Sequence, residues 1–140
     1  MLFKENMKML DWDLFYGNDI TAVTLISRYK TRLTTEMLTG TSTFRISYCD
    51  FKDVSANIGG AILIYVQTNE IKTLINDCLF HTCYTTQSLN DGGAILYSCA
   101  KGQLAIYKTC SYLCYTANTT SDGVNHGQFI ATFASKVKIK

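Results

Sequence analysis

The sequence contains no proline, has few charged side chains and lacks any long apolar run. Charged residues make up 17% of the 140 residues and the formal net charge is only +2, so no basic stripe of the nucleic-acid-binding kind is indicated. Lysine and arginine alternate with other residues only in short stretches, at 28–32 and 136–140, which read as solvated strand faces. No apolar run reaches the roughly 18 residues of a membrane-spanning helix. The sequence therefore predicts neither a nucleic-acid partner nor a direct membrane span.

The first residues mix charges with apolar side chains and show neither the continuous hydrophobic segment nor the cleavage site of a secretory signal. A signal peptide is therefore not visible. Without proline, every backbone N–H beyond the first residue can donate to a strand partner, which suits a protein rich in sheet.

A repeat is the main feature that is present. The segment Gly-Gly-Ala-Ile-Leu at 59–63 recurs at 92–96 and, in weaker form, at 126–130. Almost the same step along the chain separates Gly60 from Gly93 and Gly93 from Gly127. A Cys-x-aromatic element precedes each copy, at 49–51, 78–80 and 110–112. Two elements that recur in the same order indicate a repeat architecture.

Each repeat resembles two or three short strands separated by turns. Apolar residues alternate with polar ones around Cys49 and Phe51, and Gly, Asn, Asp, Ser and Thr lie between the strand-like segments. Such a small unit cannot bury its own apolar face, so it must stack on its neighbours. The predicted fold class is all-β, a right-handed parallel β-helix over residues 44–140. The paired glycines fit tight corners, where a Cβ would clash or φ must be positive.

Residues 1–43 do not join the repeat and are predicted to form an N-terminal cap and a degenerate coil. Phe3, Met7, Leu10 and Leu14 have the spacing of one helical face, so residues 2–15 are expected to form an amphipathic helix that covers the open end of the stack. Within residues 20–48, four residues occupy strand-like positions: Val23, Leu25, Phe44 and Ile46. No fourth Cys-x-aromatic element follows the third repeat. This predicts further coils of a longer chain, or pairing at that end.

The order Cys-x-Phe, polar loop, Gly-Gly-Ala-Ile across residues 44–135 resembles the repeats of polymorphic outer membrane proteins. It is also similar to Cys-rich right-handed β-helix surface proteins of parasitic protists. The resemblance implies a pectin-lyase-like fold, a place at the cell surface or outside the cell, and a role in adhesion without catalytic activity. The chain departs from the bacterial Phe-x-x-Asn pattern at Val54 and Cys83, and residues 126–128 replace Gly-Gly-Ala.

The six cysteines suggest either a metal site or packing. The spacings Cys78-x4-Cys83 and Cys110-x3-Cys114 superficially resemble two pairs of zinc ligands. The repeat places Cys83 and Cys114 in the slot of Val54, and it places Cys99 in the slot of Val66 and Phe133. Positions that exchange Cys with Val and Phe belong to a core, so we expect packing, and we expect no metal or cofactor.

Cys49, Cys78 and Cys110 are expected to form a ladder at the strand spacing of about 4.8 Å. That distance permits a disulfide, and the sequence leaves the redox state open.

One charged cluster is geometrically possible. Asp50, Lys52 and Asp53 precede a turn, and Asp77 and His81 follow one repeat later. A polysaccharide lyase or hydrolase on this fold would need such a cluster, but a general base needs partners that the sequence does not present. Lys52 and His81 align with Leu113. We therefore interpret His81 as a solvated surface residue and His126 as a turn variant, and no catalytic residue is assigned.

The loop between the Cys element and the glycines lengthens along the chain, since it covers 55–58 in the first repeat, 84–91 in the second and 115–125 in the third. Such loops serve recognition or are tolerated insertions, and the sequence does not separate the two. Asn118 in the last loop begins an N-glycosylation pattern that would apply to a secreted protein.

The sequence thus predicts a non-catalytic scaffold from a cell-surface adhesion or interaction protein, with loops that contact an unknown protein or glycan. The alternatives are a carbohydrate-active enzyme on the same fold and a nonfunctional gene fragment.

Overall fold

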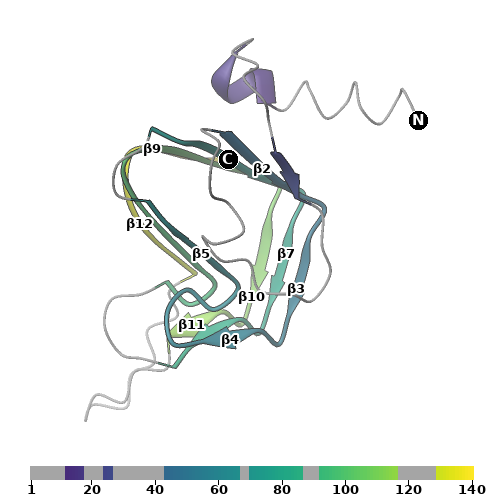
Figure 1. Cartoon of the computed structure of the whole chain (residues 1–140). Helices are drawn as coiled ribbons and strands as arrows, with labels where there is room; N and C mark the ends of the chain where they lie inside the picture. Colours follow the sequence, from purple (N-terminus) through teal and green to yellow (C-terminus); the bar gives the residue numbers. More distant parts are fainter. Residues whose placement is uncertain (1–11, 18–23, 27–42, 67–69, 87–91, 117–128) are drawn as a thin grey trace.

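The computed structural model describes residues 12–17, 24–26, 43–66, 70–86, 92–116 and 129–140. Within these ranges the protein is all-β, apart from one helical turn at residues 12–16, and every strand pairing is parallel (Figure 1). The strands are β1 (Thr24–Ile26), β2 (Thr43–Ser47), β3 (Asp50–Lys52), β4 (Ser55–Ala56), β5 (Ile62–Tyr65), β6 (Lys72–Asn76), β7 (Leu79–His81), β8 (Tyr84–Thr85), β9 (Ile95–Tyr107), β10 (Cys110–Tyr112), β11 (Tyr115–Thr116) and β12 (Ile130–Ile139). In the described part of the chain, no helix has the length and apolar character needed to cross a membrane.

The strands form three sheets, which the chain visits in a fixed order. Sheet A has the strand order β1-β2-β6-β9-β12, with β5 also paired to β9, while sheet B is β10-β7-β3 and sheet C is β11-β8-β4. The chain runs from sheet A to sheet B, then to sheet C and back to sheet A. Figure 1 shows the three sheets around a common interior, with the helical turn outside sheet A.

One frame recurs three times without insertion or deletion, at 43–56, 72–85 and 103–116. The first frame keeps one constant offset from the second in all three sheets, as in the pairs Phe44 with Thr73 and Phe51 with Phe80. The offset from the second frame to the third is also constant, from Lys72 with Gln103 to Thr85 with Thr116. Each frame contributes one strand to each sheet.

Two corners of each frame are made by a residue with positive φ. The first corner holds Tyr48, Asp77 and Lys108, and the second holds Asp53, Thr82 and Leu113, all with φ between 48° and 55°. The left-handed conformation turns the chain from one sheet to the next, while the backbone N–H still bonds to the neighbouring frame, as Asp53 does to the carbonyl of His81 at 3.0 Å. Asp tolerates this conformation better than Leu or Thr, so the second corner stores strain mainly in the later frames.

The third corner depends on glycine, as the sequence predicted. Gly59 has φ +51°, and a Cβ on Gly60 would lie 2.6 Å from the carbonyl oxygen of Tyr84. A Cβ on Gly93 would lie 2.5 Å from the carbonyl oxygen of Tyr115. Backbone from sheet C thus approaches too closely for any larger residue. Gly127, which the sequence placed in the same stack, lies outside the described residues.

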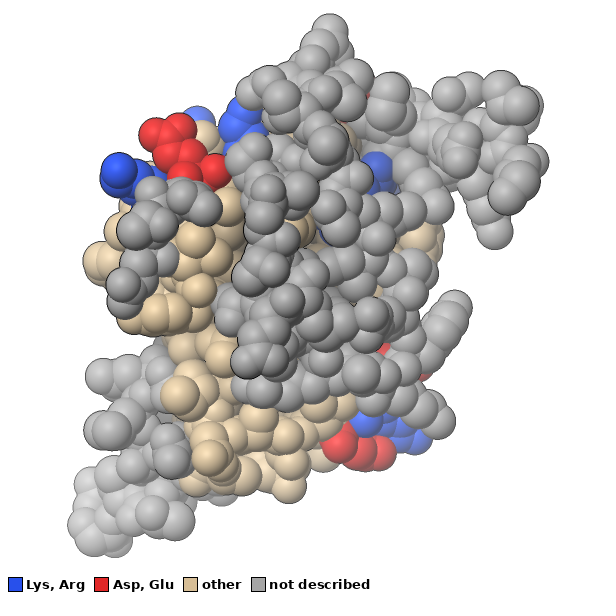
Figure 2. Space-filling model, in the orientation of Figure 1, with Lys and Arg blue, Asp and Glu red and all other residues tan. Residues whose placement is uncertain are grey.

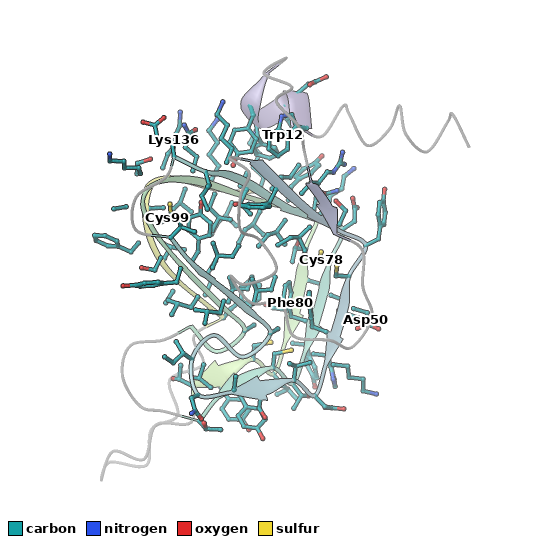
Figure 3. All side chains as sticks on the ribbon, in the orientation of Figure 1. Trp12, Asp50, Cys78, Phe80, Cys99 and Lys136 are labelled. Atoms are coloured by element: carbon teal, nitrogen blue, oxygen red, sulfur yellow. The ribbon has the colours of Figure 1, made fainter. Side chains whose placement is uncertain are left out.

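Side chains from all three sheets fill the interior. Phe51 and Phe80 stack with ring centroids 4.9 Å apart, and both are fully buried. The third frame has Ser111 at the same position, and the edge of Phe129 packs on Phe80 instead, at 5.3 Å. In Figure 3, Phe80 and Cys78 lie between the sheets, whereas Asp50 lies outside them.

The helical turn at residues 12–16 covers the outer face of sheet A. Trp12 and Phe15 are buried against Leu74 of β6 and Ala105 of β9, and the hydroxyl of Tyr16 donates to the carbonyl of Thr73 at 2.7 Å. The same burial raises the pKa of Tyr16. The expectation for this segment is partly wrong, because Leu14 is 52% exposed and the turn packs on the sheet face, not on an end. Residues 2–11 of the expected helix lie outside the described residues.

Of the four residues expected in strand-like positions within 20–48, Phe44 and Ile46 lie in β2 and are buried in the core. Of the other two residues placed there, Leu25 lies in β1 and Val23 is outside the described residues. Short strands were expected throughout, but β9 and β12 are longer because pairing continues through the bend of sheet A.

The predicted register of the third glycine element is wrong by one residue. The prediction aligned Phe129 with Ile95, whereas the structure pairs Ile130 with Ile95. The carbonyl of Phe129 accepts hydrogen bonds from the N–H groups of Ala94 and Ile95. The same shift pairs Phe133 with Ser98 and Ala134 with Cys99, so Phe133 is 67% exposed and does not share the slot of Cys99. Val66 does take that slot, since its N–H bonds to the carbonyl of Ser98 at 2.9 Å.

Candidate recognition surface

The outer face of sheet B carries a ladder of polar and aromatic side chains. Lys52 pairs with His81, and His81 pairs with Tyr112. The His81 and Tyr112 rings stack with centroids 5.2 Å apart and an interplanar angle of 19°. Nδ1 of His81 lies 3.1 Å from the hydroxyl of Thr82. The expectation that His81 is a surface residue fits its half-buried outward position, but its neighbour in the third frame is Tyr112 and not Leu113.

The carboxylates of the proposed charged cluster do not converge on His81. Asp50 pairs with Leu79, one step along the outer face from the Lys52–His81 pair. Asp53 and Asp77 are corner residues with φ of 54° and 52°, at opposite ends of the sheet B strands. The Asp77 carboxylate accepts a hydrogen bond from the Asn76 side chain at 2.7 Å. The structure therefore brings together Lys52 and His81 but assigns Asp53 and Asp77 to backbone turns.

Sheet C adds a second aromatic ladder on the adjoining outer face. Tyr84 pairs with Tyr115, and their rings stack with centroids 5.0 Å apart and an angle of 1°. Ser55 occupies the same position in the first frame. Next to this ladder, the hydroxyl of Thr86 donates to the side-chain carbonyl of Asn57 at 3.0 Å. These half-buried tyrosine rings and the exposed Thr86 side chain can make stacking contacts and hydrogen bonds with a polar partner.

The connection from sheet C back to sheet A lengthens at each passage. Ala56 pairs with Thr85 and Thr85 with Thr116 before the connection, and Ile62 pairs with Ile95 and Ile95 with Ile130 after it. The intervening stretches are therefore 57–61, 86–94 and 117–129, and each exceeds the one before by the same increment. The predicted lengthening of this loop is confirmed, and its increment is regular.

The bend within sheet A shortens at the same time. Its two halves are separated by 66–71 in the first passage, by 99–102 in the second and by only 134–135 in the third. Chain length therefore varies at the two ends of the frame and not inside it.

The structure joins none of the six cysteines in a disulfide, and five of them contact backbone carbonyls or the core. Cys49 and Cys78 each donate to the carbonyl two residues earlier, across the first corner, and Thr109 makes the same contact at 3.1 Å in the third frame. Cys83 and Cys114 repeat this contact across the second corner. Cysteine thus packs into the core and closes a corner with a weak hydrogen bond. Among the described residues, no group of three or more His, Cys, Asp and Glu side chains could hold a metal ion.

The register corrects one of the cysteine ladders. Cys83 and Cys114 share the slot of Val54, as the sequence predicted, because Tyr84 donates to the carbonyl of Val54 and Tyr115 to that of Cys83. Cys110 instead pairs with Leu79 on the outer face and is exposed. The first-corner ladder is therefore Cys49, Cys78 and Thr109. The misalignment arose because the third element has one residue fewer between its two cysteines, so Cys110 and Cys114 cannot both be in register with Cys78 and Cys83.

A buried polar cluster on the outer face of sheet A was not anticipated. Arg45 is 4% exposed, and its Nε donates to Oγ of Ser47 at 3.0 Å and to Oδ1 of Asn76 at 3.2 Å. Ser47 in turn donates to Oδ1 of Asn76 at 2.5 Å. Arg45 pairs with Leu74, which pairs with Ala105, so all three side chains lie on the outer face of sheet A. The alternation of polar and apolar residues in the sequence gives no reason to expect an arginine to be buried on this face.

Sequence reasoning also missed the tyrosine ladder. Its signal was present, because Cys83-Tyr84-Thr85 recurs as Cys114-Tyr115-Thr116. His126 and Asn118 lie outside the described residues, as does the basic alternation at 28–32. At the other basic alternation, Lys136 and Lys138 lie on the outer face of β12, in line with Gln103 and Ala105.

The described charges do not form a continuous stripe on the face shown in Figure 2, where they gather at separate places with uncharged residues between them. Comparison of the chain with models of known protein families, with curated proteins and with solved structures found no match.

Proposed function

We propose that the chain is part of a right-handed parallel β-helix that acts as a non-catalytic scaffold and presents its variable connections to a protein or glycan partner. The setting that we propose is a cell-surface adhesion or interaction protein, and this part of the proposal rests on the resemblance of the repeats.

The observation that best supports this proposal is that the frame keeps its length and register, while the connection from sheet C to sheet A changes in length. Three sheets keep one register through 43–56, 72–85 and 103–116, while the connection from sheet C to sheet A lengthens at each passage. A rigid frame with length variation only outside it suits recognition, because loops can change without cost to the core. The tyrosine ladder of sheet C adjoins these connections and enlarges the surface that a partner could contact.

The distribution of ionisable groups favours a scaffold over an enzyme. His81 is flanked by Lys52 and Tyr112, and two acids of the expected charged cluster, Asp53 and Asp77, serve as corners. A general base needs an orienting partner and a site for the reacting atom, and this arrangement offers stacking instead.

The test uses the whole chain and a variant in which the stretch 117–129 is replaced by Asn-Ile-Gly-Gly-Ala, the sequence of the first connection. Both proteins are applied to an array of neutral and acidic glycans, and both are incubated with acidic polysaccharides to follow new reducing ends and unsaturated products. We expect binding by the whole chain, loss of binding in the variant, an unchanged β-sheet circular dichroism spectrum and no turnover.

Turnover by the whole chain that disappears in His81→Ala would overturn the scaffold proposal in favour of a carbohydrate-active enzyme. If the shortened variant binds as well as the whole chain, the connection at 117–129 does not contribute to recognition. The matched control is Ser111→Ala, which changes an exposed residue of sheet B and leaves the connections intact.

A further inference from the structure

Two cysteines at the second corner form a pair of adjacent thiols. Cys83 and Cys114 occupy paired positions in consecutive frames, since Tyr115 donates to the carbonyl of Cys83 at 3.2 Å. Adjacent strands are about 4.8 Å apart, which lies within the Cα separation that a disulfide requires. Both thiols point to the interior side of the corner, where Cys83 contacts the carbonyl of Phe51 at 3.3 Å and Cys114 contacts that of Phe80 at 3.6 Å.

The two thiols differ in access and in acidity. Cys83 is fully buried, whereas Cys114 is only half-buried because it belongs to the last of the three frames. When Cys114 ionises, the Cys83 thiol can turn its single proton from the carbonyl of His81 to the Cys114 sulfur, and this lowers the pKa of Cys114 from 9.0 to about 7. The same hydrogen bond, together with burial, raises the pKa of Cys83. Cys114 is therefore the sulfur that an incoming reagent meets first and the one that ionises first.

We infer that Cys83 and Cys114 form a modification site for low-molecular-weight disulfides, with Cys114 as the attacking thiol and Cys83 as the resolving thiol. The Cys114 thiolate attacks one sulfur of the reagent disulfide and releases one reagent thiolate, which leaves a mixed disulfide on Cys114. Cys83 then loses its proton, attacks the Cys114 sulfur and releases the second reagent thiol. The protein is oxidised by two electrons, the reagent is reduced to two thiols, and a disulfide joins the second frame to the third.

The first corner supplies an internal comparison. Cys49 and Cys78 are paired in the same way, with the N–H of Leu79 bonded to the carbonyl of Cys49 at 2.9 Å, but they are only 2% and 3% exposed. The contact with the Cys49 sulfur, to which the Cys78 thiol can donate its proton, and then burial raise the pKa of Cys78. The two pairs thus share their spacing and differ in exposure, so selective reaction at the second corner would follow from access.

The experiment uses the full chain with Cys110→Ser, which removes the exposed thiol of the outer face and leaves both pairs intact. The protein is incubated with oxidised glutathione at pH 7.5 and its intact mass is followed with time. We expect a transient glutathione adduct, then the loss of two hydrogen masses. Tryptic digestion should then yield residues 73–101 linked to residues 109–136, because trypsin cleaves after Lys72, Lys101, Lys108 and Lys136.

Two further variants in the same background locate the step that fails. With Cys83→Ser the glutathione adduct should persist, and with Cys114→Ser the rate of modification should fall at least tenfold, while circular dichroism verifies that each variant is folded. A stable adduct in the Cys110→Ser protein without any internal disulfide would overturn the resolving role of Cys83. A disulfide between Cys49 and Cys78 that forms at the same rate would overturn the selectivity.

Discussion

The backbone N–H of Gly60 donates to the carbonyl of Gly93 across 3.1 Å, so the glycines of two successive connections lie one over the other. The space beside Gly60 is already filled by backbone atoms of Tyr84, whose carbonyl oxygen would lie 2.6 Å from an added Cβ. This contact joins sheet C to the start of sheet A and fixes how closely they approach.

Gly60→Ala should therefore destabilise the protein by about 3 kcal/mol, because backbone cannot move aside as a flexible side chain can. The matched change is Gly17→Ala, where φ is +65° but nothing lies within 4 Å of the added Cβ. That variant should lose only about 1 kcal/mol, the cost of the left-handed conformation alone. Urea denaturation of both variants measures the difference, and equal losses would show that the close approach at Gly60 is relieved by relaxation.

Phe80 lies at the centre of the interior stack, between Phe51 and Phe129. Phe80→Ala should reduce the free energy of unfolding by about 4 kcal/mol, because the cavity opens between two rings that cannot collapse onto each other. The control is the preceding residue, because Leu79 points outward and is 43% exposed. Leu79→Ala should cost less than about 1 kcal/mol. A similar loss in both variants would mean that the two faces of β7 are not distinguished as the structure shows.

Leu113 makes a second-corner turn with φ 51° while its side chain is 59% exposed. Asn adopts this left-handed conformation more readily than Leu, so Leu113→Asn should stabilise the protein by about 1 kcal/mol. Leu113→Ala removes the same exposed apolar surface and keeps the strain, so it should change stability by less than about 0.5 kcal/mol. Thermal denaturation of the pair separates the two effects, and identical midpoints would argue against strain at this corner.

The sequence predicted the parts of the fold that each repeat carries locally. The Gly-Gly-Ala-Ile pairing of the first two repeats, the short strands at the Cys-x-aromatic elements, and the shared slot of Val54, Cys83 and Cys114 are confirmed because each motif fixes its own position. The all-β class follows from the same pattern, since alternating side chains of short segments can be buried only between sheets.

The alignment of the third Cys-x-aromatic element was wrong because two of its cysteines could each be matched to the earlier repeats. The third element matches the others at Cys110 or at Cys114 but not at both, and only pairing with Tyr84 and Thr85 decides for the second. The positive-φ corners were not predicted because Tyr48, Lys108 and Leu113 are not residue types that favour the left-handed region. Arg45 is buried by contacts with residues that are distant in sequence, such as Asn76. The alternation of polar and apolar residues around Arg45 cannot predict such contacts.

The paired thiols at the second corner also predict how stability changes with pH. The hydrogen bond from Cys83 lowers the pKa of Cys114 to about 7 in the folded protein, against 9.0 for an ordinary thiol. Between these two values the unfolded chain binds more protons than the folded one, so the free energy of unfolding should rise as the pH rises from 7 to 9. The contribution is complete above pH 9 and is lost as the pH falls through 7.

Urea denaturation of the Cys110→Ser protein under reducing conditions measures the slope, and Cys114→Ser in that background should flatten it. A slope that survives in Cys114→Ser would assign the pH dependence to another group, and a slope of opposite sign would show that Cys83 does not stabilise the thiolate.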